Sequence, residues 1–144
     1  MDQIRQLPES RIININDKKV LMVHSRLNDI DSDPLLYQGK TLDEFVYDYD
    51  IETDYILFGH THCQTYINYW KGKPLINPGS LGCSLNSVMS FCILEVSDTV
   101  FNFSFMSIKY DNSLVKKDYV DLCVPKMGLI KKVKQNPALT LPRD

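Results

Sequence analysis

Two short apolar runs that lead into histidines constrain the fold of this chain most. Residues 19–24 (KVLMVH) are almost continuously apolar, and residues 54–58 (DYILF) form a second run that leads into the motif GHTH at residues 59–62. Continuous apolar runs of this length are typical of strands buried on both faces. The only three histidines of the chain end or follow these runs. We therefore expect all three to gather at the carboxyl ends of neighbouring strands, where open α/β sheets collect ligands and catalytic groups.

Turn signals and alternation place the elements around these runs. Residues 11–16 (RIININ) alternate apolar and polar side chains and connect tightly to residues 19–24, which predicts a β-hairpin. Residues 28–40 are polar and predict a loop. Thr41 with Glu44 three residues later forms a capping-box pattern, which predicts a short helix that ends near residue 49. Strand, helix and strand in this order predict a βαβ-like unit and an α/β fold.

The rest of the chain contains more predicted strand than helix. One or two short helices are expected within residues 112–135, with a break at residues 124–125 and a frayed tail from residue 136. We expect residues 1–135 to form a portion of one domain and residues 136–144 to be a tail. Further strands are predicted at residues 65–70, 74–77, 89–96 and 100–109.

Charge and composition exclude several classes of protein. The net charge of −2 over 144 residues argues against a nucleic-acid partner, and nine acidic residues between positions 29 and 54 are interpreted as a solvated face. No apolar run approaches the roughly 20 residues that cross a bilayer, so no membrane partner is expected. The first ten residues show no secretory signal, which predicts a cytoplasmic protein whose four cysteines are reduced and mostly buried.

His24, His60 and His62 are the candidate metal ligands. The i, i+2 spacing of His60 and His62 would point both rings the same way on an extended chain, toward one metal centre or two adjacent ones. Neutral imidazole suits Zn, Fe, Mn and Ni ions. A hydrogen-bonded structural role is the alternative for each histidine taken alone. The sequence Asn77-Pro78-Gly79-Ser80 also follows an apolar strand, and a plain turn is favoured over a role for Asn77 and Ser80 in the site.

The GHTH motif, followed about a dozen residues later by Asn77-Pro78-Gly79-Ser80, resembles the C-terminal half of a calcineurin-like metallophosphoesterase. Within that superfamily, the chain is similar to the small bacterial and archaeal phosphodiesterases. The resemblance implies part of a four-layer αββα sandwich, with two divalent ions (Mn, Zn, Fe or Ni) in an intact site. It further implies that His24 and His60 bind one ion and His62 the other. The implied reaction is hydrolysis of a phosphodiester or phosphomonoester by a metal-bridging hydroxide.

The motifs that supply the other metal ligands in this family do not occur in the chain. There is no Asp-x-His, no Gly-Asp and no Gly-Asn, and Ser25 stands where the family usually has glycine. We therefore expect the second half of the domain without its N-terminal half, incomplete or inactive as an isolated chain, with no catalytic side chain assigned. Expected partners are a phosphoester substrate and either a second copy or a chain that supplies the missing half. The alternative is a non-catalytic phosphoesterase-like scaffold that mediates protein interaction.

Overall fold

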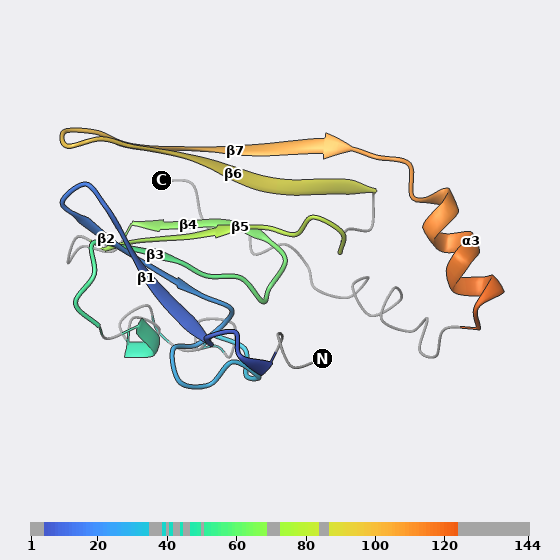
Figure 1. Cartoon of the computed structure of the whole chain (residues 1–144), viewed down its shortest axis with the longest axis horizontal. Coiled ribbons are helices and arrows are strands. Elements are labelled where there is room, and N and C mark those ends of the chain that lie inside the picture. Colours follow the sequence, from blue (N-terminus) through green and yellow to red (C-terminus); the bar gives the residue numbers. More distant parts are fainter. Residues whose placement is uncertain are drawn as a thin grey trace.

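The computed structural model describes residues 5–34, 39, 41, 44, 47–49, 51–68, 73–83 and 87–123. Most of the regular structure in these residues is β (Figure 1). The elements in chain order are β1 (Ser10–Ile15), β2 (Lys18–Val23), the 3-10 helix η2 (Tyr47–Tyr49), β3 (Tyr55–Leu57), β4 (Gln64–Asn68), β5 (Pro74–Pro78), β6 (Val88–Val96), β7 (Phe101–Lys109) and α3 (Ser113–Asp121).

Strands β1 to β5 form one mixed sheet in the order β1-β2-β3-β5-β4. The β1–β2 hairpin is confirmed, and its two-residue turn contains Asn16 at φ 52°, a conformation that asparagine tolerates well. Strands β2 and β3 are parallel neighbours, as the predicted βαβ-like unit requires. Because β3 and β5 are also parallel, three strands present their carboxyl ends at the same edge of the sheet.

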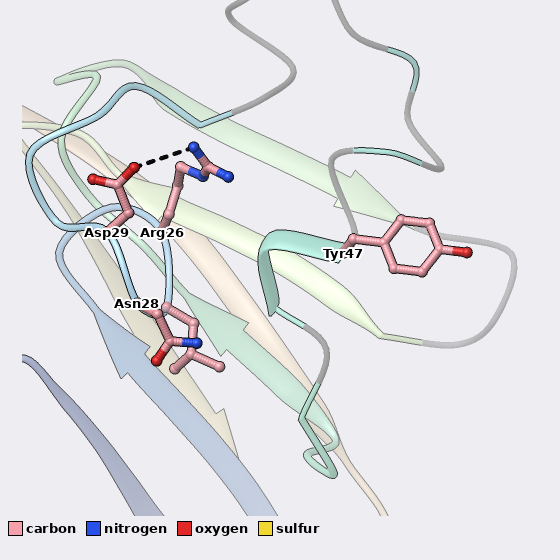
Figure 2. A pocket seen from close by; sticks show the side chains of 5 residues that line it. Arg26, Asn28, Asp29 and Tyr47 are labelled. Atoms are coloured by element: carbon pink, nitrogen blue, oxygen red, sulfur yellow. Dashed lines mark hydrogen bonds and ion pairs between the residues drawn. The ribbon is translucent and has the colours of Figure 1, made fainter.

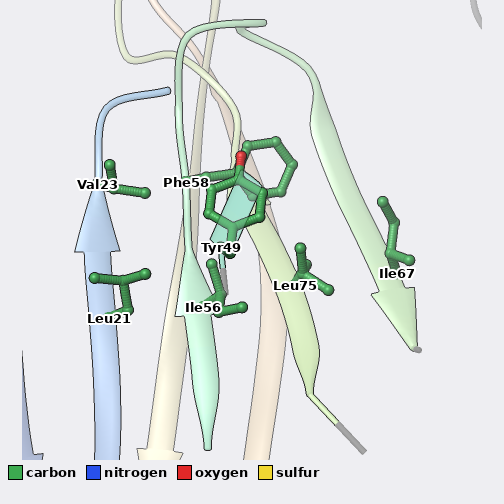
Figure 3. Close-up of a cluster of buried hydrophobic side chains, with 7 residues drawn as sticks. All are labelled: Leu21, Val23, Tyr49, Ile56, Phe58, Ile67 and Leu75. Carbon is green, nitrogen blue, oxygen red and sulfur yellow. The ribbon is translucent and has the colours of Figure 1, made fainter. Parts of the chain in front are cut away.

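The main core lies on one face of this sheet. Four of its side chains are almost fully buried (Figure 3). They are Leu21 from β2, Ile56 from β3, Phe58 just after β3, and Leu75 from β5. Tyr49 from η2 covers them, with its ring centroid 5.9 Å from that of Phe58. Burial of side chains of this size contributes about 1.5–3 kcal/mol each, so this face holds the sheet and the η2 segment together.

The opposite face of the sheet packs on a two-stranded antiparallel sheet formed by β6 and β7. Tyr55 stacks on Phe101 with centroids 3.5 Å apart and planes 8° apart, and Tyr66 lies 4.6 Å from Phe103. The two strands β6 and β7 cover the face of the five-stranded sheet only in part. Val20 is buried on this face, whereas Met22, two residues further along β2, is 43% exposed.

The outer face of the β6–β7 sheet is also apolar. Ile93, Met106 and Ile108 are exposed and share this face. They occupy positions that alternate with those of Phe101 and Phe103, which pack inward on the other sheet. Helix α3 confirms a helix near the start of residues 112–135, and Figure 1 shows it beyond the end of β7, away from the sheets. None of the helices in the described ranges is long and apolar enough to span a membrane.

The predicted helix after Thr41 is described only in part. Both halves of the capping box form, since Thr41 N and Oγ1 lie 2.9 Å from Glu44 Oε2 and Glu44 N lies 3.3 Å from Thr41 Oγ1. The segment is a 3-10 helix by residues 47–49, and most of the positions between fall outside the described residues. The break predicted at residues 124–125 and the tail from residue 136 also fall outside them.

The prediction of mostly buried cysteines is wrong. All four thiols are free, but Cys63 and Cys123 are exposed, and Cys83 and Cys92 are only partly buried. Cys63 lies in the loop after the GHTH motif, and Cys123 follows the end of α3, where neither sheet covers them.

Candidate metal centre

His24 and His60 meet at the carboxyl-terminal edge of the parallel strands. His24 directly follows β2, and His60 follows the neighbouring strand β3. Their rings are arranged edge to face at 79°, and Nδ1 of His60 lies 3.4 Å from Nε2 of His24. Two residues 36 positions apart in the chain are thus brought together, as the placement of histidines after neighbouring apolar runs predicts.

The carboxylate of Asp33, for which the sequence predicts no role in the site, lies on the other edge of the His60 ring. Oδ1 of Asp33 is 2.9 Å from Nε2 of His60. Asp33 belongs to the acidic stretch interpreted as a solvated face, and its side chain is indeed 63% exposed. The acidic residues between β2 and β3 were the available signal, but local sequence does not indicate which of them returns to a histidine.

The backbone at His60 and His62 is not the extended chain on which the spacing argument depends. Residues 60–62 are not extended, because His60 has φ 67° and His62 has φ 59°. The extended backbone that would point both rings the same way is therefore not formed. His62 is exposed as a residue. Partial burial, followed by the charges of His60 and His24, lowers the pKa of His62, which favours the neutral imidazole that metals require.

Asn77 holds the GHTH loop in this conformation. It is fully buried, and its side-chain amide donates to the carbonyl oxygen of Gly59 at 2.7 Å and to the hydroxyl of Thr61 at 2.9 Å. Its Oδ1 accepts a hydrogen bond from the backbone N–H of Gly79 at 2.9 Å. The turn at residues 77–80 is thus also a clamp on the histidine loop, a positioning role that the favoured reading as a plain turn missed.

Two glycines allow the strand ends to approach one another. The backbone N–H of Gly59 donates to the carbonyl oxygen of His24 at 2.8 Å, and a Cβ at Gly59 would lie 3.2 Å from that oxygen. Gly79 has φ 89°, and a Cβ there would lie 2.7 Å from Cβ of Ser90. Gly79 is therefore required both by backbone conformation and by the contact between the two sheets.

The described residues fit a metal ion in part. Two nitrogens bound to one tetrahedral ion at about 2.0–2.1 Å stand roughly 3.4 Å apart, which matches the separation between His60 Nδ1 and His24 Nε2. That distance is long for a hydrogen bond between the two rings. Within the described part of the chain, however, no group of three or more His, Cys, Asp or Glu side chains is arranged to hold a metal. The two imidazoles thus have the separation expected of two ligands of one ion, without a third ligand beside them among the described residues.

A cavity of about 240 Å³ lies beside the loop that follows β2. Figure 2 shows Arg26 and Asp29 pointing toward one another, while the ring of Tyr47 points away from both. Nη1 of Arg26 lies 3.3 Å from Oδ2 of Asp29. The hydrogen bond from the Ser32 hydroxyl is the main cause that lowers the pKa of Asp29, so this carboxylate is charged opposite Arg26. The cavity is lined by Arg26, Leu27, Asn28, Asp29 and Tyr47.

The profile of the calcineurin-like phosphoesterase superfamily domain matches residues 1–99 of this chain. The matched segment contains all three histidines and the Asn77–Ser80 turn. No curated protein sequence gives a significant match.

Solved structures show the same partial fold at low sequence identity. A hypothetical protein from Pyrococcus horikoshii OT3 aligns with 90% of this chain and 51% of its own, at 15% identity and a TM-score of 0.65. An uncharacterised predicted phosphoesterase from Streptococcus pneumoniae TIGR4 aligns over 69% and 54%, at 22% identity and a TM-score of 0.50. Vps29 from Entamoeba histolytica, solved with Zn²⁺, aligns over 74% and 63%, at 21% identity and a TM-score of 0.51. The chain spans about half the length of the first two.

Proposed function

Because this chain belongs to the calcineurin-like phosphoesterase superfamily, we propose that it is the histidine-bearing half of a metal-dependent phosphoesterase. In this proposal His24 and His60 bind one divalent ion and His62 contributes to a second. The observation that carries the proposal is the 3.4 Å separation between His60 Nδ1 and His24 Nε2. The finer fold that goes with the proposal is the second half of an αββα sandwich, in which the two sheets described above are the inner layers.

In this proposal, residues of this chain bind the ion and orient its histidine ligands. His24 and His60 place ring nitrogens 3.4 Å apart, and Asn77 fixes the loop that carries His60 and His62. A bound divalent ion at this edge would supply acidification of water and neutralisation of charge on the phosphoryl oxygens of a phosphodiester or phosphomonoester. Zn, Mn, Fe and Ni all accept imidazole, so the ligand set is compatible with each.

The test is metal stoichiometry and affinity, measured by elemental mass spectrometry and competition titration with Zn²⁺ and Mn²⁺. His24→Ala and His60→Ala are each expected to weaken binding by at least about tenfold, because each removes one of two adjacent ligands. Cys63→Ser is the matched control, since it removes an exposed thiol beside His62 and should leave binding unchanged. Binding by both histidine variants equal to that of the unmodified chain would contradict the proposal.

We propose that the remaining ligands come from a polypeptide that supplies the other half of the fold. Three features support this. The solved structure from Pyrococcus is matched over only 51% of its length. The two-stranded sheet packs against a sheet of five strands, and Met22 stays exposed on the face between the two sheets. Further strands beside β6–β7 would cover this face and pair an open sheet edge. In isolation, the same surfaces are expected to associate with another copy.

Light scattering over a range of concentrations tests this association. The chain should be larger than a monomer, and Met22→Lys should reduce its mean mass by placing a charge on the exposed part of the face between the sheets. Leu114→Lys on α3 is the control, because it alters an exposed apolar residue away from the sheets. A monodisperse monomer at every concentration would contradict the proposed association.

A non-catalytic scaffold is the second candidate. The observation that favours it is that the described residues place only two imidazoles within ligand distance of one another. Hydrolysis of a model phosphodiester separates the two candidates. A scaffold would show no metal-dependent hydrolysis even when the complementary half is present and metal is bound.

A further inference from the structure

Asp33 and His24 contact opposite edges of the His60 ring. Asp33 Oδ1 lies 2.9 Å from Nε2, and His24 Nε2 lies 3.4 Å from Nδ1. An ionised carboxylate can only accept hydrogen bonds, so the Asp33 contact requires the proton of the His60 ring to be on Nε2. In neutral His60 the lone pair is then on Nδ1, the atom that faces His24.

The loop that carries Asp33 is held by two hydrogen bonds at Ser32, the residue before it. The hydroxyl of Ser25, which is fully buried, donates to the carbonyl oxygen of Ser32 at 2.5 Å, and the backbone N–H of Ser32 donates to Asp29 Oδ1 at 3.2 Å. Pro34, which directly follows Asp33, is also fully buried. Asp33 therefore lies between two fixed neighbours, although its own carboxylate is largely in solvent.

From this geometry we infer that Asp33 is a positioning residue for the metal site, which rests on the function proposed above. Its carboxylate accepts the Nε2–H of His60, fixes the tautomer and the orientation of the ring, and so leaves Nδ1 as the ligating atom beside His24 Nε2. A carboxylate hydrogen-bonded to the far nitrogen of a ligating histidine raises the basicity of the ligand and restricts rotation of the ring. Asp33 does not reach the same point as a ligand, because it contacts the opposite edge of the ring.

The experiment compares Asp33→Ala with Asp31→Ala. Asp31 is exposed and lies two residues away in the same loop, so its removal changes the net charge equally. In the metal-free protein, nitrogen-15 NMR of the His60 ring should show a protonated Nε2 in the unmodified chain and in Asp31→Ala. Asp33→Ala should shift both ring nitrogens toward the tautomer mixture of free imidazole. Zn²⁺ affinity should fall by about 10- to 100-fold in Asp33→Ala and remain unchanged in Asp31→Ala.

Each result decides the inference. Equal ring-nitrogen shifts in the two variants would overturn it, and so would a loss of affinity in Asp33→Ala without a change in the His60 ring, since that would indicate action through charge or direct ligation. If the unmodified chain binds no Zn²⁺, the proposed function fails, whereas the metal-free NMR comparison still decides whether Asp33 sets the tautomer. Asp33→Asn adds a check, because its amide can donate to Nε2 and so favours a proton on Nδ1.

Discussion

Asn77 donates its side-chain amide to the carbonyl oxygen of Gly59, at 2.7 Å and across 18 positions of the chain. The same amide binds Thr61, and its oxygen accepts from Gly79, so one buried side chain connects the end of β5 to the loop after β3. The left-handed backbone at His60 lies between the two residues that this side chain holds, and the left-handed backbone at His62 follows directly after them. Conformations of this kind persist only where the surroundings enforce them.

Asn77→Ala is expected to destabilise the protein by about 2–4 kcal/mol, because it leaves three partly buried groups without their partner and each unpaired group costs about 1–3 kcal/mol. Urea unfolding measures the change. The affinity for Zn²⁺ should fall as well, since the histidine loop loses its clamp. Asn102→Ala on the exposed face of β7 should change stability by no more than about 0.5 kcal/mol. Equal effects of the two substitutions would refute the positioning role of Asn77.

Gly79→Ala should destabilise the protein by at least about 2 kcal/mol, since the left-handed backbone alone costs roughly 1–2 kcal/mol. The added Cβ also meets Ser90 at 2.7 Å. Two glycines separate these causes. Gly39 has φ 77° with open space around it, so Gly39→Ala should show only the backbone effect. Gly82 has open space and no positive φ, so Gly82→Ala should be close to neutral. Thermal unfolding of the three variants should rank them in that order.

Acid should destabilise the metal-free protein through His62. Burial and the neighbouring histidines lower the pKa of His62 in the folded state. Below about pH 6.5 the unfolded chain therefore binds a proton at His62 more readily than the folded protein does. The contribution of neutral His62 to the free energy of unfolding is therefore fully present above about pH 6.5. It is lost as the pH falls through the lowered pKa of His62 in the folded state. Urea midpoints measured with a chelator from about pH 7.5 to 5 should fall less steeply for His62→Gln. Parallel curves would count against this prediction.

The thiols should differ in reactivity. Burial raises the pKa of Cys92, so less of it is thiolate at mildly alkaline pH, and access to it is restricted. Cys63 and Cys123 are exposed. Alkylation by iodoacetamide, followed by peptide mass spectrometry, should modify Cys63 and Cys123 before Cys92. Urea should remove the difference, and a difference that persists in urea would show that it does not arise from the fold.

The strands and the meeting of His24 with His60 could be predicted because local signals determine them. Alternation located β1 and apolar runs located β2 and β3, and adjacent parallel strands bring the residues that follow them to one edge of the sheet. The strands at residues 89–96 and 100–109 were predicted as well, but not their separation into a second sheet.

The conformation of the GHTH loop could not be predicted, because it depends on a side chain from β5. An extended chain was the natural expectation for a segment that follows a strand, and Asn77 overrides it through contacts distant in sequence. Asp33 was missed for a related reason. Nothing local separates it from the other acidic residues around it, and only the closure of the loop after β2 brings it to His60. The cysteines were misjudged because residue type predicts burial only on average.

The parallel pairing of β2 with β3 has a consequence for the order of folding. The β1–β2 and β6–β7 hairpins join neighbouring strands, and such contacts form within microseconds. Pairing β2 with β3 must instead close the whole segment between them, and non-local contacts of this kind form late. His24 and His60 depend on that pairing, so they come together among the last events of folding. A metal ion bound between them would therefore report on molecules that have completed the fold, and not on those in which only the hairpins have formed.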